Sequence, residues 1–556
     1  MSAAEAAAAA ARAQGAPVFI RALTPSEVAG FSTGAGPLDG LPFAMKDNLD
    51  LRGMPTTGGC PALVAPAGTT AAAAQRLIDA GAVPIAKTNL DQFATGLVGT
   101  RSPYGVCASI DSPLHVSGGS SSGSAVAVAS GVVPLALGTD TAGSGRVPAA
   151  FNGLVGVKPT RGLVSTAGLM PACRSLDCVT TLTRTVSDAR EAMAVLTAFD
   201  PGDPWSRPAP VLAPAGVAAF AGVVAVPRTP LDLDPVHRAA WEAAVEHVRT
   251  VADHVVEVDI EPFLAAGRLL YEGPWLAERW AAFGHLLEPD GPHLDPVVRQ
   301  VVLPGRDLLA ADLFAGIDRL ASLRRASEPT WDDVDALLLP VSAGHPTLAD
   351  VAADPIGANL RLGTYTSFVN LLDLCAVAVP AGRRTDGLPF GVQLVAPAFA
   401  DGPLLELAAR WCGEPSSSVA AGEGRTLLAV VGAHLSGLAL NSQLVDSGGR
   451  LHRRARTAGG YRLFALPGDG VARPGLLRSS GGPAGGIALE VWDLPHQGVG
   501  MLADLIPRPL GLGTVELADG SGVLGFLAEG AGLRDAADIS GSGGWRAYLQ
   551  GRETQA

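Results

Sequence analysis

The sequence predicts an α/β domain built around one mixed β-sheet, followed by a smaller C-terminal α+β domain. Strand-like and helical segments alternate through the first 412 residues, as where the helical pattern of residues 71–80 gives way to the strand-like VPIAKTN. A small-residue segment at 414–424 then interrupts the periodicity, and mainly strand-like segments follow it. These observations predict a large domain over 1–413, a linker over 414–424 and a second domain over 425–556.

Local signals justify the elements of the large domain in order. Thr24 is expected to cap a short helix that starts at Pro25. Residues 124–138 form an apolar, small-residue run, which is typical of a buried helix followed by a strand. Farther along, Asp234 and the proline after it begin an amphipathic helix over residues 234–254. The last helix of this domain is expected to end at Gly413.

Composition excludes several classes of protein. The chain has 556 residues, of which 48% are hydrophobic and 17% charged, and this balance favours a globular enzyme over a disordered chain. A net charge of −13 argues against nonspecific binding to nucleic acid or to anionic membranes. The most apolar stretch, 124–138, is too short and too interrupted to cross a bilayer. The alanine-rich N-terminus lacks the pattern of a secretory signal, so we expect a surface helix there and a cytoplasmic protein.

The cysteines give no sign of a metal site. Six are scattered along the chain without metal-binding spacing, and reduced thiols are the expectation. Cys173 and Cys178 are close in sequence, but we expect neither a disulfide nor a metal role for them. No metal and no cofactor are therefore expected.

Two serine clusters stand at the ends of the apolar run. Gly118 and Gly119 precede three consecutive serines, and Ser144 lies in a second cluster, TAGSG. A single GGSSSG segment is typical of a flexible loop. Two such clusters around one close-packed element indicate an active site, where glycines give the backbone freedom to bring hydroxyl groups together.

Lysine usage supports this interpretation. Among the forty Lys and Arg residues only Lys46, Lys87 and Lys158 are lysines, and all three precede residue 160. Arginine stays protonated in proteins, whereas a buried lysine can lose its proton. Lys46 is therefore a candidate base, although a buried ion pair with Asp47 or Asp91 explains it equally well. For Lys87 we expect a buried structural role.

The stretch 118–153 resembles the amidase signature of the Ser–cis-Ser–Lys hydrolases, as do the upstream segments PLDGLPFAMKDNLD and TTAAAAQRLIDAGAVPIAKTNLDQFATG. The resemblance extends over residues 18–412. It implies the amidase-signature fold, with Lys46 as general base, Ser120 as bridging cis-serine and Ser144 as nucleophile. It also implies an oxyanion hole made by the backbone amides of Thr141, Ala142 and Gly143. Ala142 and Gly145 depart from the commonest family residues, but both are small.

The segment YEGPWLAERW contains a tyrosine and an arginine that could face the substrate. Tyr271 and Arg279 are eight residues apart, so a single helix would place them within about a quarter turn of each other. On its own this pattern favours a helix with an exposed arginine. The segment resembles the allophanate hydrolase branch of the family, in which the matching pair holds the substrate carboxylate through charge-assisted hydrogen bonds. Gly96, in TGLVGTRSPYG, is expected to line the same pocket.

The C-terminal segment begins with the strand-like LLAVVGAHL and includes a hairpin pattern that turns near Asp519. It resembles the C-terminal domain of allophanate hydrolases, whose fold is akin to γ-glutamyl cyclotransferases. In that family a histidine of this domain takes part in decarboxylation. His434, at the end of a predicted buried strand, fits this role best, although a histidine that caps a strand end is an equal alternative. His452 and His496, in loop-like contexts, are rival candidates.

The resemblance implies that allophanate is hydrolysed at its terminal amide to ammonia and N-carboxycarbamate, with decarboxylation assisted by the C-terminal domain. A homodimer and a functional pairing with urea carboxylase are expected. Other interpretations are an amidase for aryl or aliphatic amides, the amidase-type subunit of a tRNA-dependent amidotransferase, or a binding protein that keeps the fold without catalysis.

Overall fold

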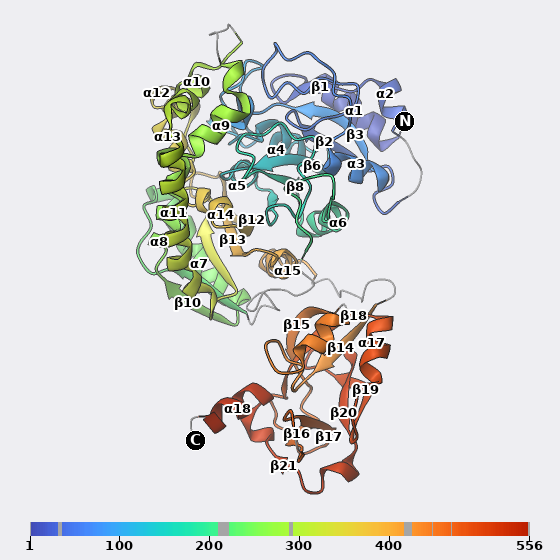
Figure 1. Ribbon diagram of the computed structural model, residues 1–556. Helices are drawn as coiled ribbons and strands as arrows, with labels where there is room; N and C mark the ends of the chain where they lie inside the picture. Colours follow the sequence, from blue (N-terminus) through green and yellow to red (C-terminus); the bar gives the residue numbers. More distant parts are fainter. Residues whose placement is uncertain are drawn as a thin grey trace. The chain divides into compact units, whose positions relative to one another are not determined.

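The computed structural model describes residues 2–31, 36–209, 222–287, 293–415, 425–447, 449–468 and 470–553. These residues belong to two compact units, one before and one after the segment 416–424 (Figure 1). Except for Glu414 and Pro415, the predicted linker lies outside the described residues. The exact ends of the predicted linker, at residues 414 and 424, therefore stay a prediction.

A large mixed sheet organises the first unit. Among the described residues it has eleven strands in the order β1-β3-β2-β6-β8-β7-β12-β13-β11-β9-β10. Strand β2 pairs in parallel with β3 and β6, whereas β8 runs antiparallel to β6 and β7, so the mixed sheet is confirmed. The strands are β1 Phe19–Ala22, β2 Pro42–Lys46, β3 Val83–Thr88, β6 Leu135–Asp140, β7 Val155–Lys158, β8 Cys178–Thr183, β9 Val223–Pro227, β10 His254–Val258, β11 Ala336–Pro340, β12 Leu374–Arg383 and β13 Pro389–Pro397. A separate two-stranded sheet joins β4 Ala108–Ser109 and β5 Ser112–Val116.

Helices cover this sheet, and several run side by side at its margin, as α8 and α11 do (Figure 1). They are α1 Ala3–Gln14, α2 Pro25–Ala29, α3 Ala72–Asp79, α4 Ser122–Ala129, α5 Arg146–Phe151, α6 Val186–Leu196, α7 Pro235–Val251, α8 Glu261–Glu272, α9 Trp275–Phe283, α10 Pro296–Val302, α11 Ala310–Ser327, α12 Leu348–Ala353, α13 Gly357–Leu362, α14 Ser367–Leu371 and α15 Asp401–Trp411. Thr24 caps α2 and Asp234 caps α7, as the sequence predicts.

The N-terminal helix is more buried than its composition suggests. Ser2 caps α1, and the helix buries Ala4, Ala7, Ala8 and Ala11 on one face. The predicted surface helix is confirmed, since its other residues are exposed or partly exposed. Alanine carries no polar group and little bulk, so a run of alanines can pack closely against the rest of the unit.

The central serine stretch folds as predicted into a buried helix and a strand. Residues 122–128 of α4 are all buried, and β6 is buried along its whole length. Helix α4 packs against β2 and β6, and α5 packs against β7 and β13 (Figure 1). The two serine clusters therefore lie at the ends of elements that the core holds rigidly.

The second unit has its own sheets and core. A five-stranded sheet in the order β15-β18-β14-β20-β19 stands beside a three-stranded sheet, β17-β16-β21, within the described residues. The predicted hairpin is confirmed, because β19 and β20 pair antiparallel on either side of residues 517–521. The elements are β14 Arg425–Val430, β15 Arg450–Arg456, β16 Tyr461–Ala465, β17 Pro474–Arg478, β18 Ala488–Pro495, β19 Leu510–Glu516, β20 Gly522–Ala528, β21 Ala537–Asp538, α16 Asn441–Asp446, α17 His496–Ala503 and α18 Trp545–Glu553.

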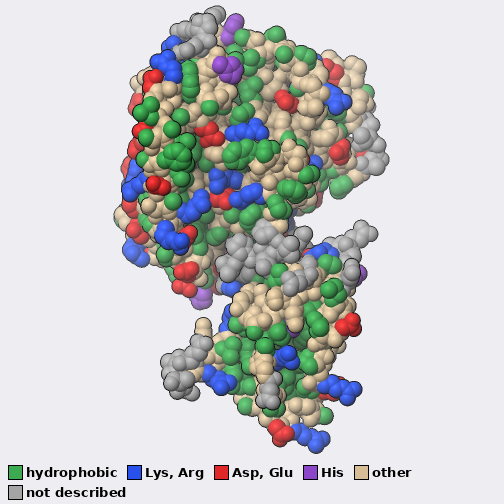
Figure 2. Space-filling view, in the orientation of Figure 1, with side chains coloured by type: hydrophobic (Ala, Val, Ile, Leu, Met, Phe, Trp, Pro, Cys, Tyr) green, Lys and Arg blue, Asp and Glu red, His purple; other side chains and the backbone are tan. Residues whose placement is uncertain are grey.

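The surface of the first unit mixes both signs of charge. On the visible face Lys and Arg side chains are interspersed with Asp and Glu side chains (Figure 2). None of the helices in the described ranges combines the length and the apolar character needed to span a membrane.

Candidate active site

Lys46 stands at the end of β2 with its side chain completely buried. Its Nζ lies 2.8 Å from Ser120 Oγ and 2.7 Å from Thr139 Oγ1. Burial lowers the pKa of Lys46 to about 7, although the carboxylates of Asp91, Asp177 and Asp140 act in the opposite direction. A substantial fraction of this amine is therefore neutral at physiological pH and able to accept a proton.

The ion-pair alternative for Lys46 fails on geometry. Asp47 pairs instead with Lys87 at 2.7 Å, and both of these side chains are only 1% exposed. Within the described residues no carboxylate forms an ion pair with Lys46. Lys87 has the buried structural role that the sequence predicts, and Lys46 is left facing hydroxyl groups.

Ser120 meets Lys46 through an unusual backbone turn. The Gly119–Ser120 peptide bond is cis, as the family resemblance implies, and Gly118 has a φ of +75°. A Cβ on Gly119 would lie 2.1 Å from Asp91 Oδ2, so only glycine fits at this position. The turn places the Ser120 hydroxyl within hydrogen-bonding distance of Lys46 Nζ.

Ser144 lies in the turn between β6 and α5 and is almost fully buried. The backbone N–H of Ser121 donates to the carbonyl oxygen of Ser144 at 3.1 Å, which joins the two serine clusters. The Oγ of Ser144 is 3.5 Å from the carbonyl oxygen of Gly96. The structure thus brings the segments of Lys46, Ser120 and Ser144 together and places Gly96 beside the predicted nucleophile.

A buried ion pair holds the turn that carries Ser144. Arg146 Nε donates to Asp140 Oδ2 at 2.9 Å, and both side chains are fully buried. Although burial opposes it, Arg146 holds the pKa of Asp140 below its usual value. The N–H of Gly143 donates to Asp140 Oδ1 at 2.8 Å, so this predicted oxyanion donor already has an acceptor. The amides of Thr141 and Ala142 are the remaining predicted donors.

Sequence reasoning missed these supporting polar residues. Asp140 and Arg146 flank Ser144 in TDTAGSGR, and their opposite charges around a predicted nucleophile were an available signal. Thr139 and Asp177 gave no local signal. Thr139 Oγ1 accepts from Lys46, while Asp177 accepts from Thr141 Oγ1 at 2.5 Å. Burial raises the pKa of Asp177 to about 6.

Tyr271 and Arg279 lie on different helices, so the prediction of one continuous helix was wrong. Gly273 and Pro274 separate α8 from α9, because proline cannot continue the hydrogen-bond ladder and disfavours helical geometry in the residue before it. Tyr271 packs against an apolar cluster that includes Ala142 of the predicted oxyanion turn. The Arg279 guanidinium carbon lies 5.7 Å from the centre of the Tyr271 ring.

Arg279 is not exposed, in contrast to what its helical pattern alone favours. The residue is 1% exposed, and its Nη1 donates to Thr95 Oγ1 at 3.2 Å. Its Nε is buried and has no hydrogen-bond partner among the described residues. Because Thr95 precedes Gly96, this guanidinium lies near the carbonyl group that faces Ser144.

His434 belongs to the second unit, in the loop that follows β14. Its ring stacks on Phe526 with 5.1 Å between the ring centres, and its Nε2 donates to Gln443 Oε1 at 3.0 Å. Burial lowers the pKa of His434, so the ring is neutral at physiological pH. His452 lies in β15 and His496 begins α17, so the loop-like context predicted for each was wrong.

The described residues contain no group of three or more His, Cys, Asp or Glu side chains that could hold a metal ion. All six cysteines are free thiols.

Comparisons with known proteins agree with the two-part organisation. The amidase family matches residues 21–405, and the allophanate hydrolase C-terminal domain matches residues 426–550. Urea amidolyase of Saccharomyces cerevisiae is 41% identical over 92% of this chain, and that of Lachancea kluyveri is 42% identical over 92%. The chain spans 30% of the length of each of these curated relatives.

Solved structures show the same resemblance. A Kluyveromyces lactis allophanate hydrolase superposes with a TM-score of 0.73 and 38% identity, over 96% of this chain and 92% of that one. A glutamyl-tRNA(Gln) amidotransferase subunit of Thermotoga maritima superposes with a TM-score of 0.61 and 29% identity, over 70% of this chain and 86% of that one. The former match, unlike the latter, covers almost the whole length of both chains.

Proposed function

Because the chain belongs to the amidase family and carries an allophanate hydrolase C-terminal domain, we propose that it hydrolyses allophanate to ammonia and N-carboxycarbamate. The observation that carries this proposal is the buried guanidinium of Arg279, which donates to Thr95, the residue before Gly96, whose carbonyl oxygen lies 3.5 Å from Ser144 Oγ. A neutral amide needs no such cation, whereas allophanate has a carboxylate one nitrogen away from the carbonyl carbon that is attacked.

In the proposed mechanism, neutral Lys46 accepts the proton of Ser120, which in turn accepts the proton of Ser144. The Ser144 oxygen attacks the terminal amide carbonyl, and the same protons return to the leaving nitrogen as ammonia departs. Water then hydrolyses the acyl-enzyme by the reverse relay. The pKa of Lys46 near 7 supports this role, because a lysine with an ordinary pKa would hold its proton too strongly.

The amides of Thr141 and Ala142 are proposed to stabilise the oxyanion, and each such donor contributes about 3 kcal/mol to lowering a barrier of this kind. Gly143 completes the predicted set as a weaker donor, since it shares its N–H with Asp140. Two buried interactions stabilise this turn. They are the ion pair of Asp140 with Arg146 and the hydrogen bond that Thr141 donates to Asp177. Its donors are thereby oriented before the substrate arrives.

Substrate recognition is assigned to three residues. Arg279 would bind the carboxylate through its free Nε edge, with the Tyr271 ring alongside the guanidinium. The carbonyl oxygen of Gly96, near both Ser144 and Thr95, would accept a hydrogen bond from an N–H group of the substrate.

Decarboxylation of the first product is assigned to the second unit. Hydrolysis converts allophanate and water into ammonium and the N-carboxycarbamate dianion. One carboxylate of the dianion then leaves as carbon dioxide when its C–N bond breaks, while the electron pair stays on nitrogen and the nitrogen takes up a proton. Carbamate, the remaining product, breaks down to ammonia and carbon dioxide. We assign His434 to this step. We further propose that the protein is a cytoplasmic homodimer and that it works together with urea carboxylase.

Ammonia release from purified protein tests the function directly. We expect release from allophanate at least a hundredfold faster than from a neutral amide such as butyramide, and no release by Ser144→Ala. Ser130→Ala, which alters a hydroxyl bonded to the α4 backbone, is the matched control and should behave as wild type. Equal rates on both substrates would indicate an amidase of another specificity, and full activity of a folded Ser144→Ala variant would refute the mechanism.

A further inference from the structure

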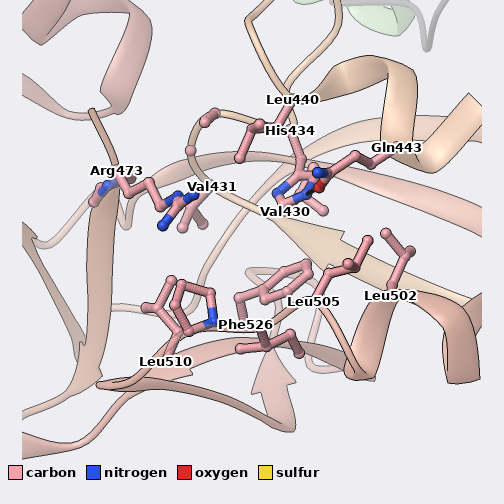
Figure 3. A pocket seen from close by; sticks show the side chains of 15 residues that line it. Val430, Val431, His434, Leu440, Gln443, Arg473, Leu502, Leu505, Leu510 and Phe526 are labelled. Carbon is pink, nitrogen blue, oxygen red and sulfur yellow. Dashed lines mark hydrogen bonds between the residues drawn. The ribbon is translucent and has the colours of Figure 1, made fainter. Parts of the chain in front are cut away.

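The second unit contains a pocket whose lining is divided between polar and apolar side chains. His434 and Gln443 come from the loop after β14 and from α16, and Arg473 precedes β17. Leu505, Leu510 and Phe526 are among the apolar residues that line the rest of the pocket. In Figure 3 the Arg473 and His434 side chains extend toward the same space, and these apolar side chains face them from the other side.

Arg473 is a cation without an anion. Its Nε is buried and has no hydrogen-bond partner, and no carboxylate pairs with it anywhere in the described ranges. Two other arginines of this unit have carboxylate partners, since Arg425 lies 2.9 Å from Asp493 and Arg453 lies 2.7 Å from Asp519. A buried donor left without an acceptor destabilises the fold, so we expect a ligand to supply the missing acceptor.

The residues around Arg473 indicate which kind of ligand fits the pocket. A guanidinium presents two parallel N–H groups that match the two oxygens of a carboxylate. Burial of the ring and the positive charge of Arg473 both lower the pKa of His434, so the histidine adds no second charge to the pocket. A small anion fits this combination when the one fixed cation holds one planar carboxylate and the apolar wall faces the rest of the molecule.

We propose that Arg473 binds one carboxylate of N-carboxycarbamate in this pocket and orients the other toward the apolar side. The proposal rests on the function proposed above, and it adds the residue that holds the second substrate. Arg473 binds the carboxylate that remains on the carbamate product. The departing carboxylate then lies against Leu505, Leu510 and Phe526, with the C–N bond between the two groups.

This placement favours loss of carbon dioxide. A carboxylate is strongly stabilised by water, and its charge spreads toward nitrogen as the C–N bond breaks. Removing water from the departing group therefore raises the energy of the ground state more than that of the transition state. The electron pair remains on nitrogen, which takes its proton from solvent, so no further reactant is needed.

Malonate, with CH₂ in place of NH, is a stable probe of this site. Calorimetric titration uses full-length protein carrying Arg279→Met, which removes the arginine assigned to the substrate carboxylate in the first unit. We expect malonate to bind this background protein and the affinity to fall at least tenfold on adding Arg473→Met. Arg473→Lys should give an intermediate value, because it keeps the charge but loses the paired N–H groups. Arg453→Met, which removes a surface ion pair, is the matched control and should leave the affinity unchanged.

A second measurement follows the intermediate in the otherwise wild-type chain. With ¹³C-labelled allophanate, Arg473→Met should slow N-carboxycarbamate decay at least tenfold relative to wild type, and Arg473→Lys should slow it less. Thermal unfolding of each variant establishes that it is folded. Unchanged malonate affinity in folded Arg473→Met, or unchanged decay of the intermediate, would overturn the inference. Failure of wild-type protein to release ammonia from allophanate would instead refute the proposed function, a result that the malonate titration does not depend on.

Discussion

At the scale of single residues, Lys46 shows how position alone can convert a cation into a base. Its side chain is fully buried and donates to the hydroxyl oxygens of Ser120 and Thr139. An ammonium is stabilised less by neighbouring hydroxyl groups than it would be by a carboxylate in direct contact. Desolvation is therefore the largest effect on its pKa, and the more distant carboxylates offset it only in part.

We expect Lys46→Arg to be nearly as damaging as Lys46→Ala, with at least a thousandfold loss of kcat in both. Arginine keeps the positive charge but cannot release its proton at neutral pH, so it cannot act as a base. Steady-state ammonia release from allophanate measures the effect, and unfolding midpoints show whether each variant is folded. Retention of most activity by Lys46→Arg would mean that another group is the base.

The protonation of Lys46 also determines how activity falls at low pH. Lys46 must be neutral to accept a proton, and its pKa lies at about 7. The kcat/KM for allophanate should therefore rise with pH and level off above about 7, falling tenfold for each pH unit below it. A profile that stays flat from pH 5 to 8, with the protein folded throughout, would contradict the assignment.

At the scale of elements, the break between α8 and α9 decides what Arg279 can do. Gly273 and Pro274 end the first helix, and the second helix turns the guanidinium inward beside Thr95. On one uninterrupted helix, the helix geometry would fix the orientation of Tyr271 relative to Arg279. Two short helices allow each side chain to approach the site from its own direction.

We expect Arg279→Ala to reduce kcat/KM for allophanate far more than for a neutral amide. Removing one partner of a buried charged pair costs about 2–5 kcal/mol, and only the anionic substrate makes that pair. Arg268→Ala, which removes an exposed partner of Glu261 from the neighbouring helix, is a suitable control. Equal losses on both substrates would show that Arg279 supports the fold and does not recognise the carboxylate.

Sequence reasoning worked where signals are local. The helix cap at Thr24, the buried helix before β6 and the β19–β20 hairpin each follow from a few neighbouring residues. The Lys46 contact with Ser120 was reached through the family motif, since it joins residues 74 apart. Physical spacing alone could not have placed it.

Other features depend on distant parts of the chain, and no local pattern encodes them. Arg146 donates to Gln393 at 2.7 Å, a contact across 247 residues that helps to hold the turn of Ser144. In sequence, Arg279 has the pattern of an exposed helical arginine. Only the folded chain shows that it donates to Thr95. The same holds for Arg473, which only the folded second unit brings to the pocket of His434.

At the scale of the whole molecule, one buried histidine links stability of the first unit to pH. His345 stacks on Phe151, and its Nε2 lies 2.8 Å from the Val116 carbonyl oxygen. Burial lowers the pKa of His345 to about 3, and the charges of Arg384 and His115 act in the same direction. Folding therefore requires the neutral ring, while the unfolded chain protonates it near pH 6.5.

We expect the free energy of unfolding to fall as pH decreases from about 6.5 toward 3, by up to about 1.4 kcal/mol per pH unit from this group. The raised pKa of Asp177 acts in the opposite direction below pH 6, because its folded form binds a proton more readily. His345→Gln removes only the first contribution, so its stability should depend less steeply on pH. Denaturant unfolding between pH 7 and 4 measures both proteins, and identical slopes would contradict the prediction.

The two units are expected to carry separate steps of one reaction, and His434 gives the means to separate them. All residues assigned to hydrolysis lie in the first unit, whereas His434 lies in the second, stacked on Phe526 and bonded to Gln443. We expect full-length His434→Ala to convert allophanate to N-carboxycarbamate at the wild-type rate, and the intermediate then to decay at its unaided rate. His452→Ala and His496→Ala, which alter a strand residue and an exposed helix start, should decay as wild type does. ¹³C spectroscopy follows the intermediate directly. Identical decay in all four proteins would make the second unit a structural module and would leave His434 without a chemical role.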